Sequence, residues 1–342
     1  MKLEYKYISK YRKELMGIAI MLIVISHNNL DFPWVFHNVN SGIKMLCQVG
    51  VDIFFLLSGF GCYYSMKKDS NPISFYRKRI MRLVPPYLTV FLIFGLYAIC
   101  VMGKPFNEYL WTYSLISFYV DNTLNEWFVA SIILVYLIYP LIYVIVEKSE
   151  AVAKALLILI YAIIVLFLCH IIRIPNPIRI VFEILGTRFP AFLIGSLMAK
   201  NSEGSRGIKL STARYIIILG VLSSILSLYV FKMKVANNWI IIRTVFIFIV
   251  FSIIICWIIV RDKAENNNII RRCTTFFTFV GGITLEIYLV HEKVLGILTP
   301  VMYGILPLSS YSVQLVIYII GTILSIFLAS YLGKFIKKMQ RK

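Results

Sequence analysis

Acidic residues are scarce in this 342-residue sequence. It contains 16 Asp and Glu against 35 Lys and Arg, and charged residues make up only 15% of the chain, whereas 60% is hydrophobic. An average soluble domain is about 45 to 50% apolar. The composition therefore excludes an ordinary globular protein and predicts a polytopic membrane protein with a net charge of +19.

Clustered cysteines are also absent. The six cysteines stand singly, mostly inside apolar segments, and the sequence has no CxxC motif and no His/Cys spacing of the kind that binds metals;. We therefore predict neither a disulfide framework nor a metal site.

Long polar linkers are missing as well. No loop exceeds about 25 residues and none is rich in Ser, Gly and Pro, so we expect one membrane domain over residues 1–342 and no separate soluble domain. The first apolar run has no small-residue cleavage site, and we expect it to be retained as the first helix. The sequence shows no convincing internal repeat of the kind that marks many transporters.

Apolar runs of about 20 residues predict the fold class, an all-α bundle of about ten transmembrane helices. Most Lys and Arg lie in the segments on one side of these runs, which by the positive-inside rule makes both termini cytoplasmic. This topology explains the net charge better than a nucleic-acid partner does. The expected spans are residues 14–31, 42–64, 83–102, 125–146, 154–172, 181–200, 212–231, 238–260, 274–295 and 311–335.

The first of these runs carries a histidine near its far end. Residues Leu15 to Leu30 cover about 24 Å at 1.5 Å per residue, which places His27 in the outer half of a bilayer core about 30 Å thick. An ionisable residue in a span marks a functional site by default. A neutral imidazole there can act as a general base on a hydroxyl that attacks an acyl carbon. The alternative is a histidine that is hydrogen-bonded between packed helices.

Two charged features follow in the sequence. Asp52 lies near the middle of the second span, where a carboxylate needs a cation or a proton, so we expect a structural pair. The stretch FYRKRIMRLVPPYL, residues 75–88, then gathers Lys78, Arg79 and Arg82 on the inner side. Guanidinium groups bind phosphates bidentately and suit an anionic cofactor. Attraction to anionic lipid headgroups explains the same charges equally well.

Five further residues of the spans are candidates for binding or supporting a substrate. Trp127 can stack on a sugar or anchor its helix at the membrane interface. Arg188 and Arg243 lie inside the sixth and eighth spans, where charges normally face the bundle interior, and either can stabilise an oxyanion. His291 stands about 140° from Glu286 on the helical wheel, so these two side chains do not point into one narrow cleft.

The motifs resemble, in their order, acyltransferase family 3, whose members are integral membrane acyltransferases that modify bacterial cell-surface glycans. The resemblance spans about residues 12–335 and implies a ten-helix core, an acyl-CoA donor taken from the cytoplasm, a catalytic histidine at His27 and an RxxR motif at Arg79 and Arg82. It rests on the His27 helix, GVDIFFLLSGF at 50–60, FxxKRxxRxxP at 75–85, EWF at 126–128, RFPAFLIG at 188–195 and ITLEIYLVH at 283–291.

The sequence departs from the family pattern at one position. Many members carry an arginine eleven residues before the histidine, and this chain has Met16 there. The nearest cation, Arg12, lies about 60° away from His27 on the helical wheel and roughly one turn further inward. Another residue must therefore supply whatever that arginine does, or the function is missing.

We therefore expect a multi-pass O-acyltransferase of the bacterial cytoplasmic membrane. It would move an acyl group, most simply acetyl from acetyl-CoA, to a hydroxyl of a cell-surface or lipid-linked glycan, with His27 as the base. The expected partners are acyl-CoA, a glycan acceptor and the lipid bilayer, with no nucleic acid, no metal and no permanently bound cofactor. Two rival interpretations are a glycan transporter or flippase, whose intramembrane charges would line a pathway, and an inactive scaffold, to which Met16 points.

Overall fold

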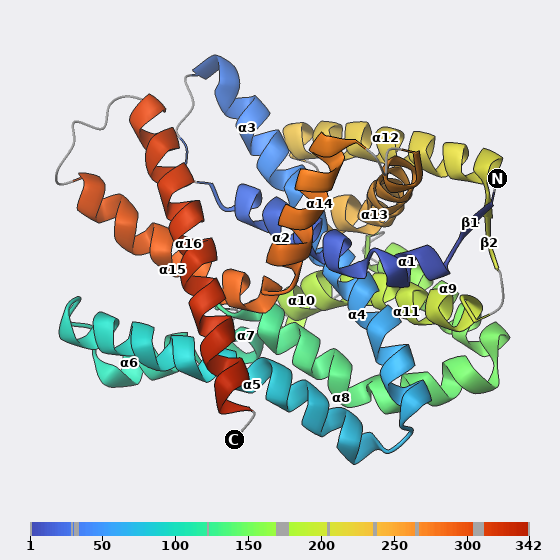
Figure 1. The fold of residues 1–342 in the computed structure, drawn as a ribbon, viewed down its shortest axis with the longest axis horizontal. Helices are drawn as coiled ribbons and strands as arrows, with labels where there is room; N and C mark the ends of the chain where they lie inside the picture. The colour runs from blue at the N-terminus through green and yellow to red at the C-terminus, as the bar shows by residue number, and fades with distance from the viewer. Residues whose placement is uncertain are drawn as a thin grey trace. The chain divides into compact units, whose positions relative to one another are not determined.

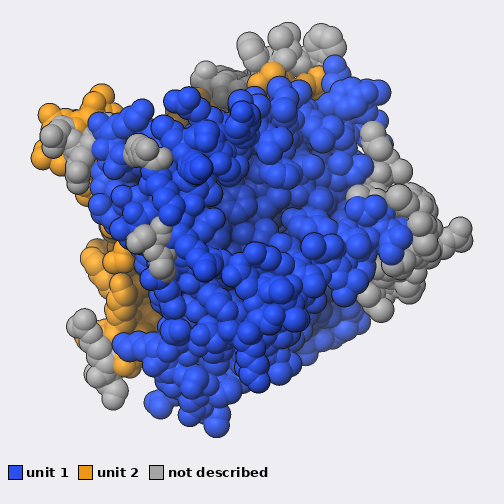
Figure 2. Space-filling model, turned by 90° about the vertical axis from the view of Figure 1, so that its right-hand side faces the viewer, with its two compact units in different colours: residues 1–12, 52–81, 95–263 blue, residues 13–51, 82–94, 264–342 orange. Residues whose placement is uncertain are grey.

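The computed structural model describes residues 2–28, 30, 34–121, 123–168, 178–203, 206–234, 238–263, 267–303 and 311–340. These residues are almost wholly helical (Figure 1), which confirms the all-α class. A helix satisfies its own backbone N–H and C=O groups, as a bilayer core without water requires. The chain divides into two compact units, coloured separately in Figure 2: unit 1 is residues 1–12, 52–81 and 95–263, and unit 2 is residues 13–51, 82–94 and 264–342.

Unit 1 contains one short antiparallel pair of strands and most of the helices. In the strand pair, Leu3 lies opposite Ile208. The elements wholly or mostly in unit 1 are β1 (Lys2–Glu4), α1 (Lys6–Lys10), α4 (Val49–Lys68), α6 (Phe106–Thr112), α7 (Ser117–Val120), α8 (Trp127–Lys148), α9 (Glu150–Leu168), α10 (Ile178–Val181), the π-helix η1 (Phe182–Gly186), α11 (Thr187–Asn201), β2 (Gly207–Lys209), α12 (Leu210–Met233) and α13 (Asn238–Lys263).

Unit 2 is built from the second and third helices and the C-terminal ones. Its elements are α2 (Arg12–Ser26), α3 (Trp34–Cys47), α14 (Asn268–Gly281), α15 (Thr284–Tyr303) and α16 (Tyr311–Met339). Helix α5 (Pro72–Cys100) contributes residues to both units.

Two glycines let α4 and α11 touch at backbone distance in unit 1. A Cβ atom added to Gly59 would lie 1.9 Å from the carbonyl oxygen of Phe192, and one added to Gly195 would lie 2.0 Å from that of Leu56. Small residues at such contacts are the usual means of packing helices in membranes. The close approach fixes how Asp52 on α4 and Arg188 on α11 face each other.

In unit 2 a similar contact seats α2 against α14. A Cβ atom on Gly281 would lie 1.8 Å from the carbonyl oxygen of Lys13. Further along α2, the hydroxyl of Tyr318 on α16 donates a hydrogen bond of 2.9 Å to the carbonyl of Val24. These contacts hold both ends of the helix that carries His27 at its C-terminus.

Eight helical segments of the described chain are long and apolar enough to cross a membrane. Helices α14 and α15 add a ninth if they count as one broken span, since they meet at an angle of 82°. The eight are His37–Lys68, Pro72–Cys100, Trp127–Lys148, Glu150–Phe167, Arg179–Asn201, Leu210–Met233, Asn238–Lys263 and Val313–Met339.

Three of the ten expected spans, 14–31, 83–102 and 274–295, differ clearly from the structure, and parts of 14–31 and 154–172 lie outside the described residues. The first expected span, 14–31, is a helix that ends at Ser26 and has 15 residues. The expected span 274–295 is wrong as a single helix, because Gly281 ends α14 and the chain bends before Thr284. Glycine is a poor helix former, and glycines are a common site of sharp kinks.

The basic stretch belongs to the same helix as the apolar span that follows it. The expected span 83–102 began two residues before Pro85, whereas α5 begins at Pro72, capped by the side chain of Asn71, and continues through Pro85 and Pro86. One turn beyond them, the hydroxyl of Thr89 donates to the carbonyl of Pro85. Lys78, Arg79 and Arg82 therefore lie on turns of α5 that lead directly into the apolar span.

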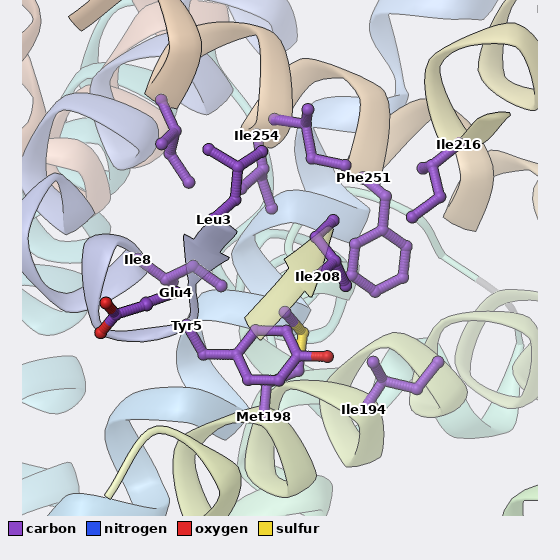
Figure 3. A pocket seen from close by; sticks show the side chains of 12 residues that line it. Leu3, Glu4, Tyr5, Ile8, Ile194, Met198, Ile208, Ile216, Phe251 and Ile254 are labelled. Atoms are coloured by element: carbon purple, nitrogen blue, oxygen red, sulfur yellow. The ribbon is translucent and has the colours of Figure 1, made fainter. Parts of the chain in front are cut away.

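Unit 1 also encloses an apolar cavity of about 230 Å³ beside the strand pair (Figure 3). Its only charged lining residue is Glu4, whose carboxylate pairs with Lys6 at 2.7 Å. The cavity is lined by Leu3, Glu4, Tyr5, Ile8, Ile194, Met198, Ile208, Ile216, Phe251, Ile254, Ile255 and Ile258. None of the residues predicted to carry chemistry lies there.

Candidate active site

Helix α2 ends at the sequence Ser26-His27-Asn28, and the side chains on either side of His27 determine where the helix stops. The last four carbonyls of a helix lack intrahelical partners. Here Ser26 Oγ donates to the carbonyl of Ile23 at 2.7 Å, and the Asn28 amide donates to that of Ile25 at 2.8 Å. Polar side chains of this kind compete with the helical hydrogen bonds of the backbone. His27 is thus the first residue beyond the helix, not a residue within it as the sequence predicted.

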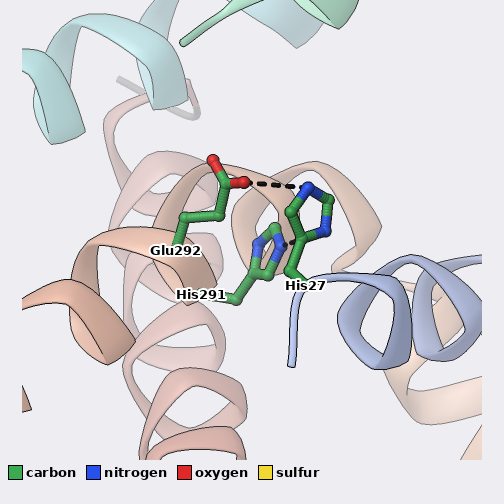
Figure 4. Close-up of side chains that lie close together, drawn as sticks. All are labelled: His27, His291 and Glu292. Carbon is green, nitrogen blue, oxygen red and sulfur yellow. Dashed lines mark hydrogen bonds and ion pairs between the residues drawn. The ribbon is translucent and has the colours of Figure 1, made fainter. Parts of the chain in front are cut away.

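His27 meets two residues of α15, which together we call the histidine cluster: His27, His291 and Glu292 (Figure 4). Nε2 of His27 lies 2.8 Å from Oε1 of Glu292. Nδ1 of His27 lies 3.4 Å from Nε2 of His291, and the two rings meet edge to face. His291 is fully buried, whereas the side chains of His27 and Glu292 are 36% and 46% exposed.

Backbone carbonyls set the tautomers in this cluster, because a carbonyl oxygen can only accept a hydrogen bond. Nδ1 of His291 lies 3.0 Å from the carbonyl of Ile287 and 2.8 Å from that of Tyr288, so its hydrogen sits on Nδ1 and Nε2 offers a lone pair. Nδ1 of His27 lies 2.8 Å from the carbonyl of Ile23 and carries a hydrogen as well. Nε2 of His27 then faces the carboxyl group of Glu292, and the two must share a proton.

A second set of contacts holds the segment just after His27. Asn28 and Asn40 of α3 exchange amide hydrogen bonds of 3.3 and 3.1 Å. The ammonium of Lys44, one turn further along α3, donates to the carbonyl of Asn28 and acts electrostatically on His27. A cation therefore stands beside the histidine cluster within unit 2.

Glu292 and Lys44 were missed by sequence reasoning, although each left a signal. Lys44 is one of the few basic residues outside the segments predicted to be cytoplasmic, so its charge needed a local explanation. Glu292 directly follows the predicted candidate His291 at the end of the ITLEIYLVH motif. Its pairing with His27 depends on how α2 and α15 meet, which no spacing in the sequence reports.

Glu286 and His291 serve different partners, as their 140° separation on α15 implies. Glu286 is buried, and its Oε1 lies 3.8 Å from the guanidinium of Arg82. Its second oxygen has no hydrogen-bond partner among the described residues. Arg82 is 47% exposed in its side chain, so a soluble anion can reach it.

Lys78 and Arg79 are held by contacts within unit 1. Lys78 pairs with Asp69 at 3.1 Å. The pKa of Asp69 is lowered to about 2, first by the hydrogen bond from Ser74 and then by that from Lys78. The guanidinium of Arg79 lies over two aromatic rings, at 5.0 Å from the centre of Phe75 and 5.3 Å from that of Tyr136.

The remaining predicted residues form a second group, the arginine cluster: Asp52, Trp127, Arg188 and Arg243, all in unit 1. Nε of Arg188 lies 4.0 Å from Oδ2 of Asp52, so the carboxylate has the cationic partner that its position requires;. Arg188 also lies over the ring of Trp127 at 4.9 Å and donates to the carbonyl of Ile184. Arg243 interacts electrostatically with both Arg188 and Asp52.

A metal ion has one geometrically suitable set of ligands in the described part of the chain. The ligand atoms of His27, His291 and Glu292 lie within 4.8 Å of one another, although the sequence predicted no metal site. An ion would have to separate Nε2 of His27 from Glu292, which are already in direct contact. The arrangement as it stands is that of a carboxylate orienting an imidazole, a combination used in proton transfer.

Comparisons with known proteins agree with the resemblance seen in the sequence. A family model described as an acyltransferase domain, that of acyltransferase family 3, matches residues 15–333. No curated protein matches the chain, and no solved structure does. The match covers nearly the whole chain and confirms the family, and with it an acyltransferase whose apolar helices can cross a membrane several times.

Proposed function

The chain belongs to acyltransferase family 3, and we propose that it transfers an acyl group from acyl-CoA to a hydroxyl of a cell-surface or lipid-linked glycan. Acetyl-CoA is the simplest donor. The observation that carries this proposal is the 2.8 Å contact between His27 and Glu292, because it provides an oriented and partly exposed imidazole at the end of the apolar helix α2.

The proton count at the histidine cluster defines the reactive state. Since Nδ1 of His27 points to a carbonyl, only Nε2 can take a proton from an acceptor, and in the resting pair it shares a proton with Glu292. His27 becomes a base once that proton has left to solvent. The exposure of both side chains gives it a route.

The transfer step then balances without any further reactant. Nε2 of His27 removes the proton of the acceptor hydroxyl as the hydroxyl oxygen bonds to the acyl carbon. The C–S bond of the thioester breaks, and the proton passes from His27 to the sulfur of CoA. Glu292 stabilises the imidazolium between the two proton transfers, and His291 fixes the ring through Nδ1.

The donor has to reach His27 from the inner side. From Met16 to His27 the helix rises about 16 Å, a distance that the long, thin pantetheine arm of CoA can bridge between helices. Arg79 and Arg82 are the residues we assign to the nucleotide phosphates, with Lys78 beside them, because guanidinium groups bind phosphate bidentately. In the structure Arg82 pairs with Glu286 at 3.8 Å. Because this separation is long for an ion pair, a bound phosphate can displace Glu286 from Arg82.

Lys44 is the residue we assign to the function expected of an arginine at position 16. Its ammonium lies beside His27 through the carbonyl of Asn28. A cation there stabilises the negative charge that develops on the acyl oxygen in the transition state. Arg12 is engaged elsewhere, since its guanidinium donates to the carbonyl of Leu57 on α4.

The experiment that tests the proposal uses purified protein in nanodiscs with radiolabelled acetyl-CoA. Wild type should release CoA in a manner that depends on added glycan acceptor, whereas His27→Ala should lose activity by about 10²- to 10⁴-fold, the usual contribution of a general base. The matched control is His37→Ala, which removes an exposed histidine of α3. An active His27→Ala protein would overturn the assignment of the base, and an inactive wild type would favour the scaffold.

The acceptor is best identified in cells. Mass spectrometry of surface glycans from cells with and without the gene should show one acyl substituent that is lost with the gene. The mass difference gives the acyl group, and fragmentation gives the hydroxyl. Identical glycans in the two strains would contradict a glycan acceptor.

A further inference from the structure

The arginine cluster combines charges from separate helices at one place in unit 1. Asp52 comes from α4, Arg188 from α11 and Arg243 from α13, and Trp127 is the first residue of α8. Asp52 and Arg188 are almost fully buried, at 2% and 1% exposure, whereas Arg243 and Trp127 are half-buried. The cluster is thus a buried charge pair with a partly open side formed by an arginine and an indole.

The charges of this cluster do not cancel. The carboxylates that act on Arg243 are Asp52 and Glu183. Glu183 accepts a hydrogen bond of 2.9 Å from Arg179 and is neutralised by it. Among the four residues that define the cluster, one carboxylate, Asp52, therefore acts on two guanidinium groups, which gives these four residues one positive charge in excess. An excess cation within membrane-spanning helices is costly unless an anion accompanies it.

The arginine cluster also contains buried polar atoms that make no hydrogen bond to the described residues. Nε of Arg188, Nε of Arg243 and Oδ2 of Asp52 are buried, and none of them has a hydrogen-bond partner in the described part of the chain. The 4.0 Å separation of Arg188 and Asp52 is too long for a direct hydrogen bond;. Each buried unpaired donor carries a desolvation cost, which an acceptor entering the cluster would remove.

The cluster lies at one end of its helices, and the opposite end is basic. Helices α4, α8 and α11 all run from the cluster to ends that carry lysines in their last turns: Lys67 and Lys68 on α4, Lys148 on α8 and Lys200 on α11. The two ends are about 18 to 30 Å apart along these helices. By the positive-inside rule the basic end faces the cytoplasm. The arginine cluster therefore faces the outer side, where a glycan is found and the nucleotide of CoA is not.

We infer that the arginine cluster binds an anionic group, a carboxylate or a phosphate, of the glycan acceptor. Arg243 supplies a guanidinium on a half-buried residue, Arg188 supplies a fully buried one, and Asp52 lies beside Arg188 as the competing anion. Each guanidinium lies over an indole, Arg188 over Trp127 and Arg243 over Trp239 at 5.3 Å, and in each the buried Nε–H has no hydrogen-bond partner in the described part of the chain and can donate to an oxyanion;. The acceptor is therefore an acidic glycan. The identification of the bound molecule as the acceptor rests on the proposed function, whereas the anion site itself does not.

The two indoles provide the readout for a binding test. Purified wild-type protein in a buffer low in chloride is titrated with glucuronate and with glucose 1-phosphate, and tryptophan emission is recorded. Glucose is the uncharged control. Saturable quenching by an acidic sugar, with none by glucose, is the expected result. Absence of saturable binding by both acidic sugars overturns the inference.

Two variants with opposite expected effects separate binding from misfolding. Arg243→Gln should weaken anion binding by about tenfold or more, since a charge-assisted hydrogen bond is lost. Asp52→Asn should strengthen it several-fold, because the competing carboxylate is removed. Arg214→Gln, an exposed arginine of α12, is the matched control and should bind as wild type does. Equal affinity in all four proteins overturns the inference.

Two further titrations separate this site from the transfer reaction. Coenzyme A should not quench in a manner that depends on Arg243; if it does, the anion is the phosphate of the donor and the acceptor assignment is wrong. His27→Ala should bind the acidic sugar as wild type does. A His27→Ala protein that retains transferase activity contradicts the proposed function alone. A wild-type protein that binds neither acidic sugar contradicts the anion site alone.

Discussion

Glu292 of α15 lies 2.8 Å from Nε2 of His27, and it is the one acidic side chain that the structure pairs with this histidine in the described chain. The imidazole ring of His27 is oriented from both sides, because Glu292 contacts its Nε2 and the carbonyl of Ile23 contacts its Nδ1. The pair shares a single proton in the resting state. Activity should therefore depend both on the carboxylate and on pH.

Glu292→Gln should lower kcat for acyl transfer by about tenfold or more. A charge-assisted hydrogen bond contributes about 1.5 to 3 kcal/mol, and about 1.4 kcal/mol corresponds to a factor of ten. Steady-state kinetics with saturating donor measures this, and Glu108→Gln, an exposed glutamate of α6, serves as the control. A Glu292→Gln enzyme with wild-type kcat would show that the carboxylate does not orient the base.

The pH dependence of kcat/KM should shift to lower pH in Glu292→Gln. In wild type kcat/KM should rise with pH as the pair loses its shared proton. The negative charge of Glu292 favours the imidazolium, so removing it lets His27 lose its proton at lower pH, and the rise should shift to lower pH. Profiles of kcat/KM for both proteins between pH 5 and 9 decide this. An unchanged profile, or a shift to higher pH, would show that the charge of Glu292 does not stabilise protonated His27.

Arg82→Ala should raise KM for acyl-CoA, and Arg82→Lys should recover little, because lysine lacks the planar fork that grips a phosphate. Arg77→Ala removes an equal charge from an exposed position five residues earlier on α5. Equal effects of Arg77→Ala and Arg82→Ala would favour attraction to anionic lipids. The measurement is donor kinetics at matched expression.

Lys44→Gln should lower kcat more than it changes KM, because the charge we assign to Lys44 is needed chiefly in the transition state. Met16→Arg should be neutral or harmful in wild type. A charge in mid-span costs about 2.5 to 3.5 kcal/mol on insertion scales. Both variants and wild type are compared for acyl transfer under identical expression. An inactive wild type that gains activity with Met16→Arg would show that nothing has replaced the arginine.

Gly195→Ala should lower the thermal stability of the protein, since its Cβ atom would lie 2.0 Å from the carbonyl oxygen of Leu56. Overpacking of this kind costs about 1 to 3 kcal/mol or more. Gly296→Ala on α15 is the control, because a Cβ atom there meets nothing within 4 Å. Thermal unfolding in detergent measures both. Equal Tm values for the two variants would mean that α4 and α11 separate at no cost.

The helical class follows from the sequence because long apolar runs with few charges have no stable alternative in a bilayer. The helix ends were harder to predict. Periodicity indicated one helix over 274–295, but the Gly281–Gly282 pair breaks it, and the close approach of Lys13 explains why Gly281 is needed. In the other direction, the expected span began at residue 83, whereas α5 begins at Pro72 and runs through Pro85 and Pro86.

His27 was predictable because an ionisable side chain in an apolar run is costly and therefore needs a reason. The same reasoning found Asp52, Arg188 and Arg243 one by one, without their grouping. Glu292 was not found, because an acidic residue near a helix end in the sequence has no evident cost. Its importance comes from contact with a histidine near the other end of the chain.

The sequence by itself determined that this protein is a membrane-embedded acyltransferase of family 3, which residues are too polar for their apolar surroundings, and which ends of the helices are basic. Only the tertiary structure decided that His27 meets Glu292 and His291, and that Asp52 faces two arginines with one positive charge in excess. The physical reason is that helices apolar on nearly all sides carry little information about which face packs against which neighbour. Which helix faces pack together is decided by close backbone contacts, such as that between Gly59 of α4 and the carbonyl of Phe192 of α11;. These contacts set the distances between charged side chains from distant parts of the chain.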